Sequence, residues 1–137
     1  MWTCSKCGRI FEKENQVHSC KKIPFKDHFK NKEKAQKLFD YLLKSINTKI
    51  GKCQIISLPC CVHLYGKYDF LAALPKRDKL EIRFSLDRIL GSSRLKQSVP
   101  VSSKYYKNCI DINSGEEIDE ELIKWLNESY FLKNKNS

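Results

Sequence analysis

The chain has 137 residues, of which 41% are hydrophobic and 11% aromatic, so it can bury a globular core and lacks the composition of a disordered protein. It carries 26 lysines and arginines against 16 acidic residues, and this net charge of +10 favours contact with polyanions. No apolar run approaches the ~20 residues of a membrane-spanning helix. The N-terminus also lacks the apolar stretch of a secretory signal, because Lys6, Arg9 and Glu12 are charged. We therefore expect a cytoplasmic protein whose seven cysteines stay reduced.

The segment CSKCGRIFEKENQVHSC, residues 4–20, has the ligand types and spacing of a zinc site. Gly8 follows the Cys-x-x-Cys turn and can leave backbone amides free to face the thiolates, while Trp2 and Phe11 can form a small apolar lid. A closed set of four ligands leaves no position for water, which favours structural Zn²⁺ over catalytic Zn²⁺. The alternative is three buried cysteines and a surface histidine. The predicted ligands are Cys4, Cys7, His18 and Cys20, within a zinc-binding unit at residues 1–22.

A basic stretch at residues 21–34 reads as a linker that leads into a helix. His28 in this stretch is expected to be solvated. Asn31 is a candidate N-cap and Gly51 a stop signal. The apolar positions between them have helical spacing, at Ala35, Leu38, Phe39, Leu42 and Ile46.

The apolar period then changes to two, which predicts an antiparallel meander of about five strands joined by short turns. Pro59, Gly66-Lys67 and the segment 75–78 supply turn residues. Residues 87–101 are expected to hold a short helical turn and an irregular arm. The predicted strands are 53–58, 61–65, 70–74, 80–86 and 105–112.

The last predicted element is a helix with Asp119 as its N-cap and acidic residues in its first turn. Its apolar face comprises Ile118, Leu122, Trp125, Leu126, Ser129 and Tyr130. With both helices on one side of the sheet, residues 23–132 form an α+β domain that follows the zinc unit. Residues 133–137 are expected to form a flexible tail.

The segments WTCSKCGRIF, VHSC, FLAALPKRDKLEIRFSL and IDEELIKWLNESY together resemble a bacterial family known only as domain-of-unknown-function family 5655. The resemblance covers nearly the whole chain and is most specific at its two ends. It implies the α+β fold and the zinc ligands Cys4, Cys7, His18 and Cys20, and it implies no reaction. The vicinal pair Cys60-Cys61 departs from the family pattern.

The positive charge is unevenly distributed: residues 1–34 carry +5, residues 35–114 carry +8 and residues 115–137 carry −3. Basic residues beside Tyr105 and Tyr106 suit phosphate contacts with base stacking. We therefore predict a nucleic-acid-binding surface on the cationic body. Its candidate residues are Arg9, Lys13, Lys21, Lys22, Arg88, Arg94, Lys96, Lys104, Tyr105 and Lys107.

A second candidate site lies on the strand 61–65, where Cys61, His63 and Tyr65 share one face. If Asp69 or Cys53 also pointed there, the group could bind a second metal or activate a thiolate. Cys53, Cys60 and Cys109 are expected to be small buried residues rather than reactive thiols. The chain has no Gly-rich phosphate loop and no Gly-x-Ser-x-Gly or His-Glu-x-x-His motif.

The sequence thus predicts a small zinc protein that binds a polyanion, in the first place nucleic acid, without chemistry of its own. A protein-interaction module with a structural zinc is one alternative, and an enzyme that uses the Cys61-His63 face is another. The sequence does not distinguish DNA from RNA and does not indicate an oligomeric state.

The Cys4→Ser substitution should unfold the zinc unit while the α+β domain stays folded, because the unit has little apolar core of its own. Circular dichroism in the far ultraviolet measures this. Loss of the entire signal in the variant would contradict the independence of the two parts.

Overall fold

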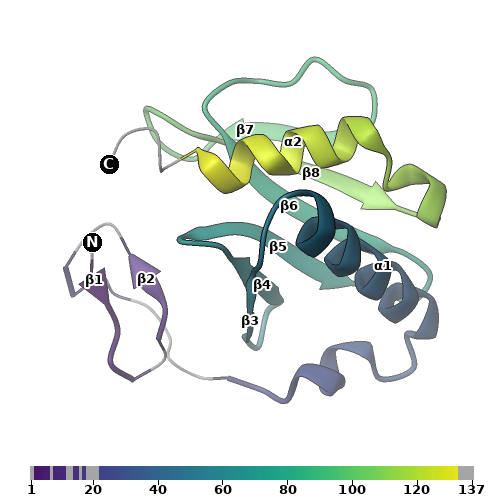
Figure 1. Cartoon of the computed structure of the whole chain (residues 1–137), viewed down its shortest axis with the longest axis horizontal. Helices are drawn as coiled ribbons and strands as arrows, with labels where there is room; N and C mark the ends of the chain where they lie inside the picture. Colours follow the sequence, from purple (N-terminus) through teal and green to yellow (C-terminus); the bar gives the residue numbers. More distant parts are fainter. Residues whose placement is uncertain (1, 7, 12–13, 16, 18–21, 133–137) are drawn as a thin grey trace.

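The computed structural model describes residues 2–6, 8–11, 14–15, 17 and 22–132. A six-stranded antiparallel sheet carries two helices on one face. A separate two-stranded hairpin near the N-terminus lies beside this sheet (Figure 1). The α+β class is therefore confirmed. Among the described helices, none is long and apolar enough to cross a membrane.

The sheet has the strand order β3-β4-β5-β6-β8-β7, with every neighbouring pair antiparallel. The first four strands form the predicted meander. The strands are β3 (Gln54–Ser57), β4 (Val62–Tyr65), β5 (Asp69–Pro75), β6 (Leu80–Leu86), β7 (Leu95–Pro100) and β8 (Tyr106–Ile112).

The prediction of about five strands missed β7, which lies in the segment expected to be an irregular arm. This strand forms the edge of the sheet and pairs only with β8, and none of its residues is fully buried. Its side chains therefore lack the buried alternation that reveals a strand. Pro100 at its end is tolerated because an edge strand has an unpaired side.

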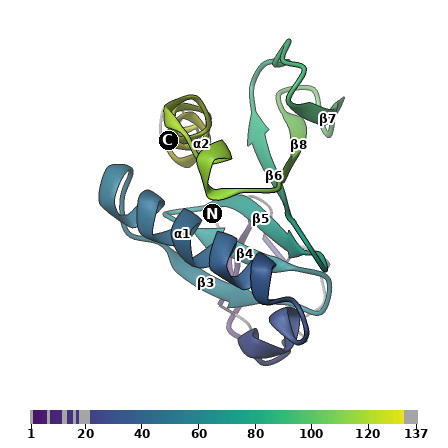
Figure 2. The same ribbon diagram turned by 90° about the vertical axis from the view of Figure 1, so that its right-hand side faces the viewer.

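The helices α1 (Glu33–Lys49) and α2 (Glu120–Phe131) both cover the same face of the sheet (Figure 2). The five predicted apolar positions of α1 are its five buried residues. Asp119 caps α2 as predicted, since its carboxylate accepts the Leu122 N–H at 3.0 Å. Asn31 does not cap α1: the N-cap is Lys32, and Asn31 adopts the left-handed conformation with φ of 60°.

The expected linker contains a 3₁₀ helix, η1 (Phe25–Phe29), that belongs to the core. Phe25 and Phe29 each place their ring centroid 5.4 Å from that of Phe39 on α1. His28 is only 8% exposed, so the prediction that it is solvated is wrong. The many charged residues of this stretch suggested a solvated linker, whereas Phe25 and Phe29 pack it against the core. A second short 3₁₀ helix, η2 (Gly115–Glu117), precedes α2.

The end of α2 holds the turn between β4 and β5. The Tyr130 ring lies against Gly66 so closely that a side chain there would collide with it, and its hydroxyl donates to the Lys52 carbonyl at 3.0 Å. The buried Ser129 hydroxyl donates to the Phe70 carbonyl at 2.9 Å. Gly66 is therefore favoured by its packing against Tyr130 of α2.

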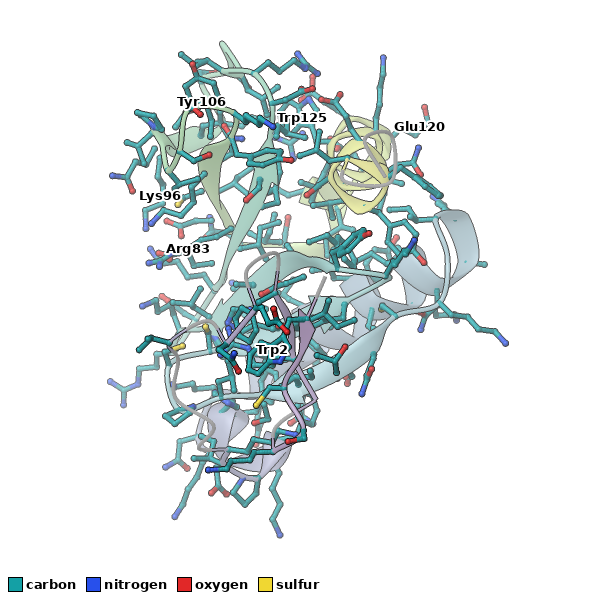
Figure 3. The ribbon with its side chains drawn as sticks, turned by 90° about the vertical axis from the view of Figure 1, so that its left-hand side faces the viewer. Trp2, Arg83, Lys96, Tyr106, Glu120 and Trp125 are labelled. Atoms are coloured by element: carbon teal, nitrogen blue, oxygen red, sulfur yellow. The ribbon has the colours of Figure 1, made fainter. Side chains whose placement is uncertain are left out.

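None of the described helices covers the second face of the sheet, which we call the open face. Arg83 and Lys96 project from this face, on the side away from α2 and Trp125 (Figure 3). The N-terminal hairpin, β1 (Trp2–Thr3) paired with β2 (Ile10–Phe11), approaches β4 through a hydrogen bond from Arg9 Nε to the Tyr65 hydroxyl at 3.1 Å. Polar side chains of the sheet and of the N-terminal hairpin therefore meet on the open face.

Candidate functional site

Three side chains of the open face are joined in series by hydrogen bonds. Cys61 Sγ lies 3.1 Å from His63 Nε2, and His63 Nδ1 lies 2.7 Å from Asp69 Oδ2. Cys61 directly precedes β4, His63 lies within it and Asp69 begins β5. A thiol, an imidazole and a carboxylate in this order are the nucleophile, base and orienting group of a triad.

An irregularity in the sheet brings Asp69 to this face. The pairs Val62–Ala73, His63–Ala72 and Leu64–Leu71 are in regular register, but Tyr65 then pairs with Asp69. Phe70 is thus an extra residue in β5, and its ring packs against Tyr130 with centroids 5.0 Å apart. A regular register would set Phe70 opposite Tyr65, on the open face, and Asp69 would lose this position.

The hydrogen bonds alter the protonation of the pair. Burial alone would lower the pKa of His63, but hydrogen bonds to Asp69 and Cys61 and their negative charges outweigh burial and raise that pKa from 6.5 to about 10. Burial alone would raise the pKa of Cys61, yet the hydrogen bonds from His63 and Cys60 and the imidazolium charge lower it below 9.0. Both directions favour a thiolate beside an imidazolium.

Three further described thiols, Cys53, Cys60 and Cys109, lack this environment. Burial raises the pKa of Cys53 and of Cys109. Burial and the adjacent Cys61 raise the pKa of Cys60, although His63 opposes this. Among these four cysteines, Cys61 is the one whose pKa is lowered.

Tyr65 closes the end of the site nearest the hairpin. It is 3% exposed, and burial together with the charge on Asp69 raises the pKa of its hydroxyl to about 12. The side chain therefore stays a neutral phenol and accepts the hydrogen bond from Arg9. The Arg9 guanidinium also lies 4.9 Å from the centroid of the Phe11 ring. These contacts connect the hairpin to the triad.

A cavity of about 830 Å³ opens over the triad, between the hairpin, the loop before β4 and the open face. Its volume is that of a small-molecule site. Arg9, Arg83 and Lys107 line it, and Asp69 is the only carboxylate among the described lining residues. The cavity is therefore suited to a ligand that carries negative charge.

Cys60, Cys61 and His63 form a group that could hold a metal ion, because their ligand atoms all lie within 4.8 Å of one another. Cys60 Sγ is 2.9 Å from Cys61 Sγ. Cys60 is exposed, whereas it was expected to be buried. Of the other two, Cys109 is buried as expected and Cys53 is half-buried.

Of the predicted zinc ligands, only Cys4 belongs to the described residues; Cys7, His18 and Cys20 lie outside them. Cys4 is 5% exposed. Its N–H donates to the Arg9 carbonyl at 2.9 Å, its carbonyl accepts the Gly8 N–H at 2.8 Å, and Gly8 has φ of 77°. The expected tight turn is thus present around Cys4.

Most residues of the predicted nucleic-acid surface do not form one cationic patch. Arg88 pairs with Glu128 at 2.9 Å, Arg94 pairs with Asp119 and Glu121 at 3.0 and 2.9 Å, and Lys96 pairs with Glu81 and Asp111 at 2.8 and 3.3 Å. Lys22, Lys104 and Tyr105 lie elsewhere on the exposed or half-exposed surface, while Lys13 and Lys21 fall outside the described residues. Arg9 and Lys107 instead line the cavity.

The sequence indicated part of the site. It placed Cys61, His63 and Tyr65 on one face, and it named Asp69 and Cys53 as possible partners. Asp69 joins the group, whereas Cys53 Sγ contacts Asn47 Oδ1 at 3.5 Å. Arg83 was not predicted to lie at the site. Its signal was available, since the cross-strand row His63–Ala72–Arg83 follows from the register of the meander.

In a comparison with known families, the family described as Domain of unknown function (DUF5655) matches residues 25–133, and the chain belongs to this family. The matched region contains the triad and begins after the predicted zinc segment. No curated protein and no solved structure matches the chain significantly.

Proposed function

We propose that this member of the DUF5655 family is a cysteine-dependent acyl-transfer enzyme in which Cys61 is the nucleophile. The observation that carries the proposal is the pair of hydrogen bonds, 3.1 Å from Cys61 to His63 and 2.7 Å from His63 to Asp69. Their position at the floor of a cavity supports it, because a nucleophile must be reachable by a substrate.

The chemistry follows from the roles of the three groups. The Cys61 thiolate attacks the carbonyl carbon of an ester or thioester, and His63 Nε2–H gives its proton to the leaving group. Water then loses a proton to Nε2 and attacks the thioester on Cys61. The thiolate leaves, the imidazolium is restored, and the net reaction is hydrolysis to a carboxylic acid and the leaving alcohol or thiol.

Asp69 has a positioning role in this mechanism. Its carboxylate accepts a hydrogen bond from His63 Nδ1–H, which fixes the ring so that Nε2 faces the sulfur. Arg9, Arg83 and Lys107 favour a substrate with a carboxylate or phosphate near the reacting carbonyl. The substrate class is therefore a small anionic acyl compound.

The test is acylation by 4-nitrophenyl acetate and by the anionic 4-nitrophenyl succinate, in reductant and without added metal. Wild-type protein should release a burst of about one nitrophenolate per chain, faster with the anionic ester, and mass spectrometry should find the acyl group on Cys61. Cys61→Ser should abolish the burst, and His63→Gln should slow it by about 10²-fold or more because the proton donor is lost.

The matched control is Cys109→Ser, which makes the same change at a buried cysteine outside the cavity and should leave the burst unchanged. An acyl group found on Cys60, or an equal burst in Cys61→Ser, would refute the proposal.

A structural Zn²⁺ held by Cys4, Cys7, His18 and Cys20 is part of the same proposal for the N-terminal unit. The burial of Cys4 and the tight turn at Gly8 support it. The role of such a zinc would be to hold the hairpin that carries Arg9 over the cavity. In this view the N-terminal unit forms one wall of the site.

Nucleic-acid binding is a second candidate function, supported by the net charge of +10 and by Lys104 and Lys107. Neither lysine forms an ion pair with a carboxylate among the described residues, in contrast to Arg88, Arg94 and Lys96. Both lie along the chain segment that also contains Tyr105. A polyanion following this segment would reach the cavity through Lys107.

Fluorescence anisotropy of short DNA and RNA probes at two salt concentrations tests this candidate. The double substitution Lys104→Ala, Lys107→Ala should weaken binding and reduce the slope of log K against log salt by about two, whereas Lys49→Ala on the exposed surface of α1 should change little. Absence of binding at low salt would eliminate the candidate.

A further inference from the structure

The thiols of Cys60 and Cys61 lie side by side although the residues are adjacent in sequence. Adjacent side chains of an extended strand point to opposite faces. Cys60 lies in the loop before β4, and there its Sγ comes within 2.9 Å of Cys61 Sγ. The Cys61 sulfur in turn lies 3.1 Å from His63 Nε2. The loop therefore places the Cys60 sulfur next to the Cys61 sulfur and His63 Nε2, so that three potential ligand atoms lie together.

Two thiolates and one imidazole are a donor set that suits zinc. Tetrahedral zinc with Zn–S of about 2.3 Å and Zn–N of about 2.0 Å separates its ligand atoms by roughly 3.5–3.8 Å. The present Sγ–Sγ and Sγ–Nε2 distances are shorter than these by a few tenths of an ångström to about one ångström. Small side-chain rotations would therefore reach the zinc geometry. Three protein ligands leave the fourth position open, and all three residues line the cavity.

Asp69 supports metal binding from behind the histidine. Its carboxylate lies 2.7 Å from His63 Nδ1 and accepts a hydrogen bond from it, so that a metal would bind at Nε2 by displacing the proton there. A carboxylate that orients a ligating histidine in this way is the usual outer partner of a zinc site. The side chains on the open face thus provide both the ligands and the group that positions one of them.

We propose that Cys60, Cys61 and His63 form a zinc-binding site of their own, distinct from the predicted N-terminal site, and that zinc there inhibits the enzyme. Bound zinc occupies the sulfur of Cys61 and Nε2 of His63, so neither can attack or protonate a substrate. Metal binding stands independently of the proposed reaction, while the inhibition rests on it.

Titration of metal-free, reduced protein with Co²⁺ tests the site directly, because thiolate-to-cobalt charge transfer reports coordination without any activity. Wild-type protein should bind one equivalent more than Cys60→Ser, whether or not the N-terminal unit also binds cobalt. Cys109→Ser is the matched control and should bind as wild type does. Equal stoichiometry, affinity and absorption in Cys60→Ser and wild type would overturn the site.

Asp69→Asn supplies a second variant that keeps all three ligands, and it should weaken cobalt binding about 10–100-fold. Far-ultraviolet dichroism of each variant checks that it is folded. The acyl burst of wild-type protein should disappear when Zn²⁺ is added. A burst that persists with zinc bound overturns the inhibition, whereas a missing burst without zinc defeats the proposed enzyme and leaves the cobalt result to decide the metal site.

Discussion

The one-residue shift in pairing between β4 and β5 determines which side chains meet on the open face. Because of this shift, Tyr65 pairs with Asp69 and Phe70 turns to the helices. The packing of α2 maintains it: Ser129 holds the Phe70 carbonyl and Tyr130 fills the space above Gly66. The position of the carboxylate beside His63 therefore depends on contacts on the opposite face of the sheet, and the core and the site are parts of one arrangement.

The basic residues discussed above form ion pairs, line the cavity or, in the case of Arg83, do both. The acidic α2 and the segment before it neutralise Arg88 and Arg94, and the pair Glu81 and Asp111 holds Lys96 on the open face. The net charge of +10 therefore overstates the surface available to a polyanion. Arg9, Arg83 and Lys107 line one cavity with a single carboxylate among its described lining residues, although Arg83 also pairs with Glu81 at 2.9 Å. Such a distribution favours a small anionic ligand.

The sequence predicted those parts of the fold that depend on local periodicity. The buried face of α1, the cap of α2 at Asp119 and the strand β6 follow from spacing alone. The edge strand β7 and the burial of His28 were missed because half-exposed and charged surroundings conceal them.

For the site, the sequence predicted that Cys61 and His63 share a face, but whether Asp69 joined them depended on a register shift that has no local signature. The loop that turns Cys60 toward Cys61 is closed by the Leu58 N–H, which donates to the Cys61 carbonyl at 3.0 Å. The interpretation of Gly66 as a turn residue was incomplete, since its contact with Tyr130 joins positions far apart in the chain.

Measuring the protonation state of His63 is the most direct test of the hydrogen bonds that join Cys61, His63 and Asp69. We would follow its ring nitrogens by NMR in metal-free, ¹⁵N-histidine-labelled protein from pH 5 to 11, with the signals assigned by His63→Gln. We expect an imidazolium that persists at neutral pH and titrates toward about 10, well above the ordinary 6.5, with an Nδ1 proton protected by Asp69. A ring that titrates near 6.5 without a protected proton would contradict the thiolate–imidazolium pair on which the proposed chemistry depends.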